Sequence, residues 1–222
     1  MIDLKVIAML PVKVGSKRLP DKNFKEIVPG RALWEETLRL LMDAVHAGFL
    51  QDIFISTNDV SWACQEKDQY HIPKKKGQIL PGEIAIFEEA EENREVTDYR
   101  MGKTLGGTIA NAMDYLNQPF FKNVKFDYLL VPQVDIVPKF PYQIKEMIEF
   151  AQESKADYIV SADTDGHQVG AWRMVKNPLN LEPLGQTIGM VRFADFFIDI
   201  HYQEDLEKAQ KLYKKLLEDG DI

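Results

Sequence analysis

The sequence predicts an α/β fold in which helices are layered against a mostly parallel sheet. Short continuous apolar runs are typical of strands buried on both faces, and longer segments carry apolar residues at helical spacing. The two kinds of segment alternate along the chain, which favours a parallel sheet with crossover helices. Because the chain has 222 residues, 45% of them apolar and 28% charged, we expect one domain over residues 1–222 with a substantial core.

The first predicted elements form a strand–helix–strand unit. The apolar run "KVIAML", residues 5–10, predicts a buried strand. Residues 32–49 carry apolar side chains at intervals of four, three and four, which predicts an amphipathic helix that ends near Gly48. The run "DIFIST", residues 52–57, predicts the second strand. Residues 61–103 combine a lysine run, two prolines and an acidic block, and their pattern predicts no particular element.

The remaining elements continue the alternation. The same criteria predict, in chain order, a helix over 106–116, a strand over 127–131, a helix over 144–151, a strand over 156–162 and a closing helix over 204–219. Pro132, Pro138 and Pro141 follow the third strand and indicate an irregular connection. Residues 163–197 have a mixed pattern, and we expect them to be partly β.

Composition and charge exclude several classes of partner. The formal net charge of −8 argues against nucleic acid and anionic membranes, because their phosphates would be repelled at long range. No apolar run approaches the roughly 20 residues of a membrane span. Cys64 is the single cysteine and cannot form an internal disulfide, which fits a cytoplasmic location. Since Asp3 lies in the N-terminal segment and no small-residue cleavage site follows, we expect no signal peptide.

A cluster of basic residues stands out against this acidic background. Residues 10–27, "LPVKVGSKRLPDKNFKEI", carry five basic side chains and two acidic ones. A solvated surface loop is one interpretation, since charge runs usually have that role. The other is an anion site at the carboxyl edge of the sheet, where Gly15 would allow close backbone approach. Neither standard phosphate motif is present: Gly102-Lys103-Thr104 lacks the glycine that a Walker motif needs at 97, and no G-x-G-x-x-G follows the first strand.

Five segments resemble the acylneuraminate cytidylyltransferase family in the order that family has them. They are "LPVKVGSKRLPDKN" (10–23), "DIFISTND" (52–59), "LPGEIA" (80–85), "VPQVDIVP" (131–138) and "IDIHYQEDLEKAQKL" (198–212). The first is similar to the family pattern I-P-A-R-x-G-S-K-x-L-P-x-K-N. It matches that pattern at Pro11, Gly15, Ser16, Lys17, Leu19, Pro20, Lys22 and Asn23. The resemblance implies the three-layer Rossmann-like fold of nucleotide-diphospho-sugar transferases.

The activity that the resemblance implies is transfer of CMP from CTP to a sugar-acid acceptor, with release of pyrophosphate. A sugar hydroxyl would attack the α-phosphorus, and the protein would position and neutralise the phosphates. The resemblance places these phosphates on Lys13, Gly15, Ser16, Lys22 and Asn23.

The same resemblance implies a magnesium ion held by Asp135 and Asp199, because Mg²⁺ is usually bound by one or two carboxylates together with phosphate oxygens. Lys13, Lys22 and Asp135 would be the catalytic residues. Gln133 would either bind the sugar or cap its strand, and the two alternatives stay open.

Some residues depart from the family pattern. Lys13 replaces an arginine, Leu80 replaces the arginine of R-P-x-E-L-A, and His201 replaces the second aspartate of the closing motif. A related enzyme with another base or a sugar-phosphate acceptor is therefore an alternative. A nucleotide-binding homologue without catalysis is another. Dimers are usual in the family, so a homodimer is also an expectation.

Overall fold

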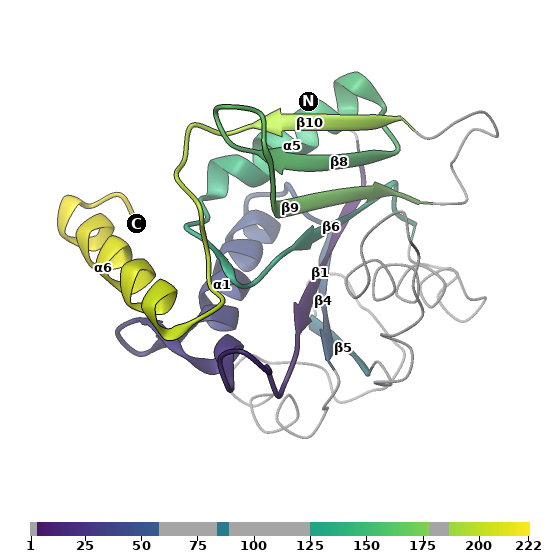
Figure 1. The fold of residues 1–222 in the computed structure, drawn as a ribbon. Coiled ribbons are helices and arrows are strands. Elements are labelled where there is room, and N and C mark those ends of the chain that lie inside the picture. The colour runs from purple at the N-terminus through teal and green to yellow at the C-terminus, as the bar shows by residue number, and fades with distance from the viewer. Residues whose placement is uncertain (1–3, 58–83, 89–124, 178–186) are drawn as a thin grey trace.

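The computed structural model describes residues 4–57, 84–88, 125–177 and 187–222 (Figure 1). In chain order the elements are β1 (Val6–Val12), the short 3-10 helix η1 (Lys22–Phe24), β2 (Glu26–Val28), β3 (Arg31–Ala32), α1 (Leu33–His46), β4 (Asp52–Thr57), β5 (Ile84–Glu88), β6 (Tyr128–Pro132), β7 (Ile136–Val137), α5 (Pro141–Ser154), β8 (Tyr158–Ala162), β9 (Gln168–Lys176), β10 (Ile188–Arg192), β11 (Ile198–Asp199) and α6 (Gln203–Asp219). The predicted helix over 106–116 lies outside the described residues.

The main sheet is mostly parallel, as the sequence predicted. Its described strands lie in the order β10-β8-β9-β6-β1-β4-β5 (Figure 1). The pairs β1–β4, β1–β6, β4–β5 and β8–β10 are parallel, and β9 runs antiparallel to both of its neighbours. The central strands β1 and β4 are almost wholly buried, which explains why each reads as a continuous apolar run.

The described helices α1 and α5 cover one face of this sheet. α1 contacts β1 and β4, α5 contacts β8, β9 and β10, and the two helices contact each other. The amphipathic pattern of α1 buries Trp34, Leu38 and Leu41 in the core. Gly48, in the left-handed region at φ 77°, follows the end of this helix, as predicted.

The proline-rich connection after β6 is shorter than the sequence suggested. Pro132 is the last residue of β6, and Pro141 is the first residue of α5. A proline at the first helical position costs no hydrogen bond, because the backbone N–H there has no partner within the helix. The side chain of Gln143 then accepts a hydrogen bond from the Phe140 backbone N–H at 3.1 Å and caps the helix.

Two small ladders lie beside the main sheet. β2 pairs with β3 ahead of α1, and β7 pairs antiparallel with β11. The second ladder joins the connection after β6 to the segment before α6, with Ile136 opposite Asp199. α6 then packs on β2 and β11. Within the described residues, no helix combines the length and apolar character of a membrane span.

Candidate active site at the carboxyl edge of the sheet

The basic loop and the loop that carries Asp135 leave the sheet at the same edge. β1 and β6 are parallel neighbours, with Ala8 opposite Leu130. Their carboxyl ends therefore lie side by side, and the residues that follow them share one edge of the sheet. This topology brings residues 13–23 close to residues 133–136.

The basic loop is shaped by its backbone and by one buried amide. Gly15 has φ 78°, a conformation that favours glycine, and no atom lies within 4 Å of where its Cβ would stand. Asn23 is buried, and its side-chain N–H donates to the Lys13 carbonyl at 3.0 Å. This hydrogen bond joins the two ends of the loop. Ser16 is half-buried within the loop.

Lys22 connects three distant segments of the chain. It lies in η1 with only 9% of its surface exposed. Its amino group donates to the Asp135 carboxylate, forming an ion pair, and to the Ile200 carbonyl at 2.8 Å. An ammonium group has three N–H donors, so these two contacts leave one donor for a ligand.

Asp135 occupies a turn between β6 and β7. The Ile136 N–H donates to the Gln133 carbonyl at 3.2 Å, and the Gln133 N–H donates to Ala171 on β9 at 3.0 Å. The turn is joined to the β11 segment by the Ile200 N–H, which donates to the Asp135 carbonyl at 2.9 Å. Gln133 is half-buried in the same turn.

Asp199 completes a pair of carboxylates at this edge. Although 44% of its side chain is exposed, partial desolvation raises its pKa, and the nearby negative charge of Asp135 raises it further. His201 opposes this rise, with its Nε2 at 3.1 Å from the Asp199 carboxylate, and Lys22 and Arg18 act in the same direction. The Asp135 carboxylate is thus close enough to disfavour the charge of Asp199, which is the situation that a cation relieves.

The donor set at this edge fits magnesium. No group of three or more His, Cys, Asp or Glu side chains in the described part of the chain could hold a metal ion by itself. Mg²⁺, however, is typically bound by one or two carboxylates, with phosphate oxygens and water as the other ligands. Asp135 and Asp199 supply two carboxylates, and a nucleotide bound to the basic loop would supply the phosphates.

The structure brings Lys22, Asp135 and Asp199 together, and it places Lys13, Gly15, Ser16 and Asn23 in the loop that leads to Lys22. Sequence reasoning missed two contributors. The Ile200 carbonyl is a backbone group, so no residue type could have indicated it. Arg18, whose charge acts on Asp199, was visible only as one of several basic residues in the loop.

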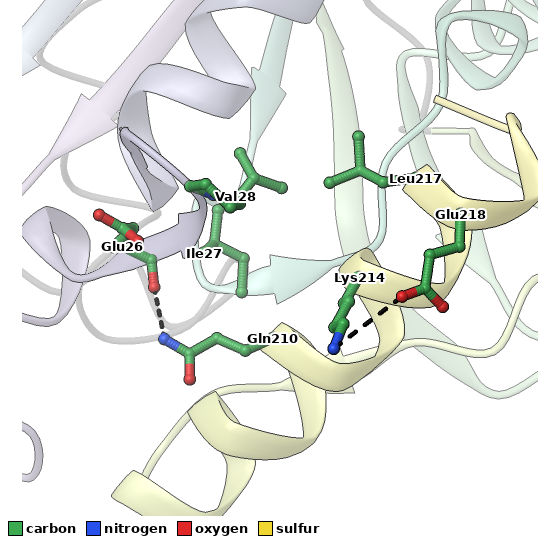
Figure 2. Close-up of a pocket in the computed structure, with 8 residues that line it drawn as sticks. Glu26, Ile27, Val28, Gln210, Lys214, Leu217 and Glu218 are labelled. Carbon is green, nitrogen blue, oxygen red and sulfur yellow. Dashed lines mark hydrogen bonds and ion pairs between the residues drawn. The ribbon is translucent and has the colours of Figure 1, made fainter.

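A pocket of about 420 Å³ lies elsewhere, between β2 and α6 (Figure 2). Ile27, Val28 and Leu217 form its apolar part. Gln210 spans it by donating to the Glu26 carbonyl at 2.7 Å. None of the residues predicted for catalysis lines this pocket, so the pocket is separate from the candidate site of Lys22, Asp135 and Asp199.

Solved structures match this chain over nearly its whole length, although no protein-family model and no curated protein matches it. CMP:2-keto-3-deoxy-manno-octonic acid synthetase, solved with CTP, is 12% identical with a TM-score of 0.62 and covers 95% of this chain and 99% of its own. HddC from Yersinia pseudotuberculosis is 14% identical with a TM-score of 0.58, over 93% and 99%.

A third match is 4-diphosphocytidyl-2C-methyl-D-erythritol synthase from Anaerococcus prevotii DSM 20548, 12% identical with a TM-score of 0.59 over 95% and 99%. HddC was also solved with GMP-PN, and that structure is 15% identical with a TM-score of 0.55 over 95% and 100%. The chain therefore has the Rossmann-like fold of these proteins. The predicted fold class is confirmed.

Proposed function

We propose that this protein is a magnesium-dependent nucleotidyltransferase that transfers CMP from CTP to a sugar-acid acceptor and releases pyrophosphate. The observation that carries the proposal is the convergence of Lys22, Asp135 and Asp199 at the carboxyl edge of the sheet. The match to a synthetase solved with CTP supports the choice of nucleotide. The location also supports it, since ligands of open α/β sheets bind outside the carboxyl ends of the strands.

The basic loop would hold the triphosphate. The positive φ of Gly15 lets the backbone approach an anion closely, and Lys13 and Ser16 add a charge and a hydroxyl donor. Lys22 would use its remaining donor on a phosphate oxygen while its bonds to Asp135 and Ile200 keep it in place. The positive charge of the segment would thus neutralise the nucleotide in an otherwise acidic chain.

Asp135 and Asp199 would hold the magnesium ion. When bound, this ion would neutralise charge on the phosphate oxygens. Asp199 is suited to this role, because partial desolvation and the charge of Asp135 raise its pKa and a divalent cation would compensate both effects. In the reaction, the oxygen of an acceptor hydroxyl forms a bond to the α-phosphorus and its proton passes to water, while the bond from that phosphorus to the leaving pyrophosphate breaks. The protein's own contribution is to position the reactants and stabilise the developing charge.

Release of pyrophosphate from CTP tests the proposal directly. The purified protein is incubated with CTP, Mg²⁺ and a panel of ulosonic acids and sugar phosphates, and pyrophosphate is measured over time. We expect turnover with at least one sugar acid, and its loss in Asp135→Asn. Absence of pyrophosphate with every acceptor and every nucleotide would reject the proposal.

A related transferase with a different base is the second candidate, because HddC was solved with GMP-PN. Thermal unfolding with CTP, UTP, GTP and ATP separates the candidates, since a ligand that binds only the folded state stabilises it by about 2.7 kcal/mol at 100 times its Kd. The largest shift should come from CTP under the first proposal and from another nucleotide under the second.

A nucleotide-binding protein without catalysis is the third candidate. His201 favours it, because an imidazole pairs with Asp199 where the family pattern has a second carboxylate. This candidate predicts a thermal shift with CTP and no pyrophosphate at any Mg²⁺ concentration. Recovery of turnover in His201→Asp would identify this residue as the cause.

A further inference from the structure

A buried lysine lies directly behind the turn that carries Asp135. Lys139, between β7 and α5, has only 1% of its surface exposed. Its amino group donates to the carbonyls of Val134, at 3.4 Å, and Ile136. These two residues flank Asp135, so the lysine contacts the turn on both sides of the carboxylate without contacting the carboxylate.

Lys139 completes the hydrogen bonding of the turn. The turn has four carbonyls, from Gln133 to Ile136. The first accepts from the Ile136 N–H and that of Asp135 from the Ile200 N–H. The other two accept from Lys139. Every carbonyl of the turn therefore has a donor within the described part of the chain, and Lys139 is a donor to two of the four.

Lys139 is almost wholly removed from water, which makes its position costly. Its amino group lies 6.0 Å from the centre of the Trp172 ring, and its backbone hydrogen-bonds the buried Tyr213 hydroxyl. The negative charges that act on it are those of Asp135 and Glu36. Burying an amino group among such side chains is unfavourable unless it is hydrogen-bonded, and the bonds that it makes are those to the turn.

We propose that Lys139 is a positioning residue, which fixes the Gln133–Ile136 turn and thereby holds Asp135 opposite Lys22 and beside Asp199. The proposal rests on the proposed nucleotidyl transfer. Its effect on rate follows from geometry, since a displacement of about 1 Å in a catalytic group can cost about 100-fold in rate.

Lys139→Met tests the role, because methionine keeps an unbranched apolar side chain and removes the donor. Lys145→Met is the matched control, since Lys145 lies on α5 with about half of its side chain exposed and pairs only with the neighbouring Glu149 at 3.7 Å among the described residues. We expect Lys139→Met to lower kcat at least about tenfold and to raise the Mg²⁺ concentration for half-maximal rate. The KM for CTP should change less than about twofold, because the basic loop is untouched. Lys145→Met should match the wild type.

A merely structural role predicts another outcome. It would lower the yield or the Tm of Lys139→Met and leave kcat per folded molecule unchanged, which would overturn the proposal. If Lys139→Met does not fold, Lys139→Gln takes its place, since its amide keeps two N–H donors on a shorter side chain. This variant should have a kcat between that of the wild type and about one tenth of it, and an unchanged kcat would again count against Lys139.

Amide hydrogen exchange provides a readout that needs no turnover. The Ile200 N–H bonds the Asp135 carbonyl, so it reports whether the turn keeps its place. We expect this amide to exchange at least about tenfold faster in Lys139→Met, a change of about 1.4 kcal/mol in local stability. If the wild type releases no pyrophosphate but this difference in exchange appears, the proposed function fails while the role of Lys139 in fixing the turn is supported. If the exchange rate is unchanged, that role of Lys139 is rejected whatever the activity.

Discussion

Replacement of Lys22 by methionine should destabilise the ligand-free protein by about 2–3 kcal/mol. The Lys22 side chain is 11% exposed and that of its partner Asp135 is 17% exposed. Methionine preserves the packing of the stem but leaves the Asp135 carboxylate and the Ile200 carbonyl without this donor. A hydrogen bond to a charged group contributes about 1.5–3 kcal/mol. Water can reach Asp135 in part, so the loss should be below the upper limit of about 5 kcal/mol for a fully buried pair.

Thermal unfolding without nucleotide measures this loss. For a chain of this length, 1 kcal/mol corresponds to about 2–4 °C, so Lys22→Met should unfold about 4–12 °C below the wild type. Lys17→Met is the control, because Lys17 is exposed in the same basic loop and its replacement removes the same charge. A Tm for Lys22→Met equal to that of Lys17→Met would refute the reasoning, since it would mean that the contacts to Asp135 and Ile200 contribute nothing.

Three further predictions concern charge and backbone. The raised pKa of Asp199 means that folding disfavours its ionised form, so Asp199→Asn should be at least as stable as the wild type at pH 7. This difference in stability should vanish once the pH falls below the pKa of the carboxyl in the unfolded chain. Urea unfolding at pH 7 and below that pKa checks the prediction, and a variant less stable than the wild type at pH 7 would contradict it. Gly15→Ala should cost about 1–2 kcal/mol because of its positive φ; equal urea midpoints would exclude that strain. Burial lowers the pKa of Lys139 to about 7, so the unfolded chain binds more protons above that pH, and stability should rise as the pH increases from 7 to about 10. Urea unfolding over this range checks the prediction, and the same pH dependence in Lys139→Met would assign it to other groups.

Four strands of the main sheet and the three described α-helices could be predicted because their signals are local, whereas β5, β9 and β10 lie in segments whose pattern predicted no individual strand. The buried strands β1, β4, β6 and β8 read as apolar runs, and α1, α5 and α6 carry helical periodicity. The ladder of β7 and β11 could not be found in this way, because two residues are too few to show a period. Its partners are also far apart in sequence, and pairing of that kind depends on the tertiary fold.

The candidate site could be predicted only as far as side-chain chemistry reveals it. Lys22, Asp135 and Asp199 were found through a family resemblance, and the structure brings them together. The Ile200 carbonyl and Lys139 were missed, since a backbone acceptor has no sequence signal and a lone lysine in a proline-rich segment indicates a surface position. The buried lysine donates to two carbonyls of the turn. These carbonyls are removed from water only in the folded chain, so the sequence gives no sign that they require a donor.

The bond from Lys22 to Ile200 spans 178 residues, and that from Lys22 to Asp135 spans 113. During synthesis the basic loop therefore leaves the ribosome long before either of these partners. Lys22 can make both bonds only after Ile200 has emerged. Completion of this edge therefore requires the closure of long loops, which is the slow kind of contact in folding.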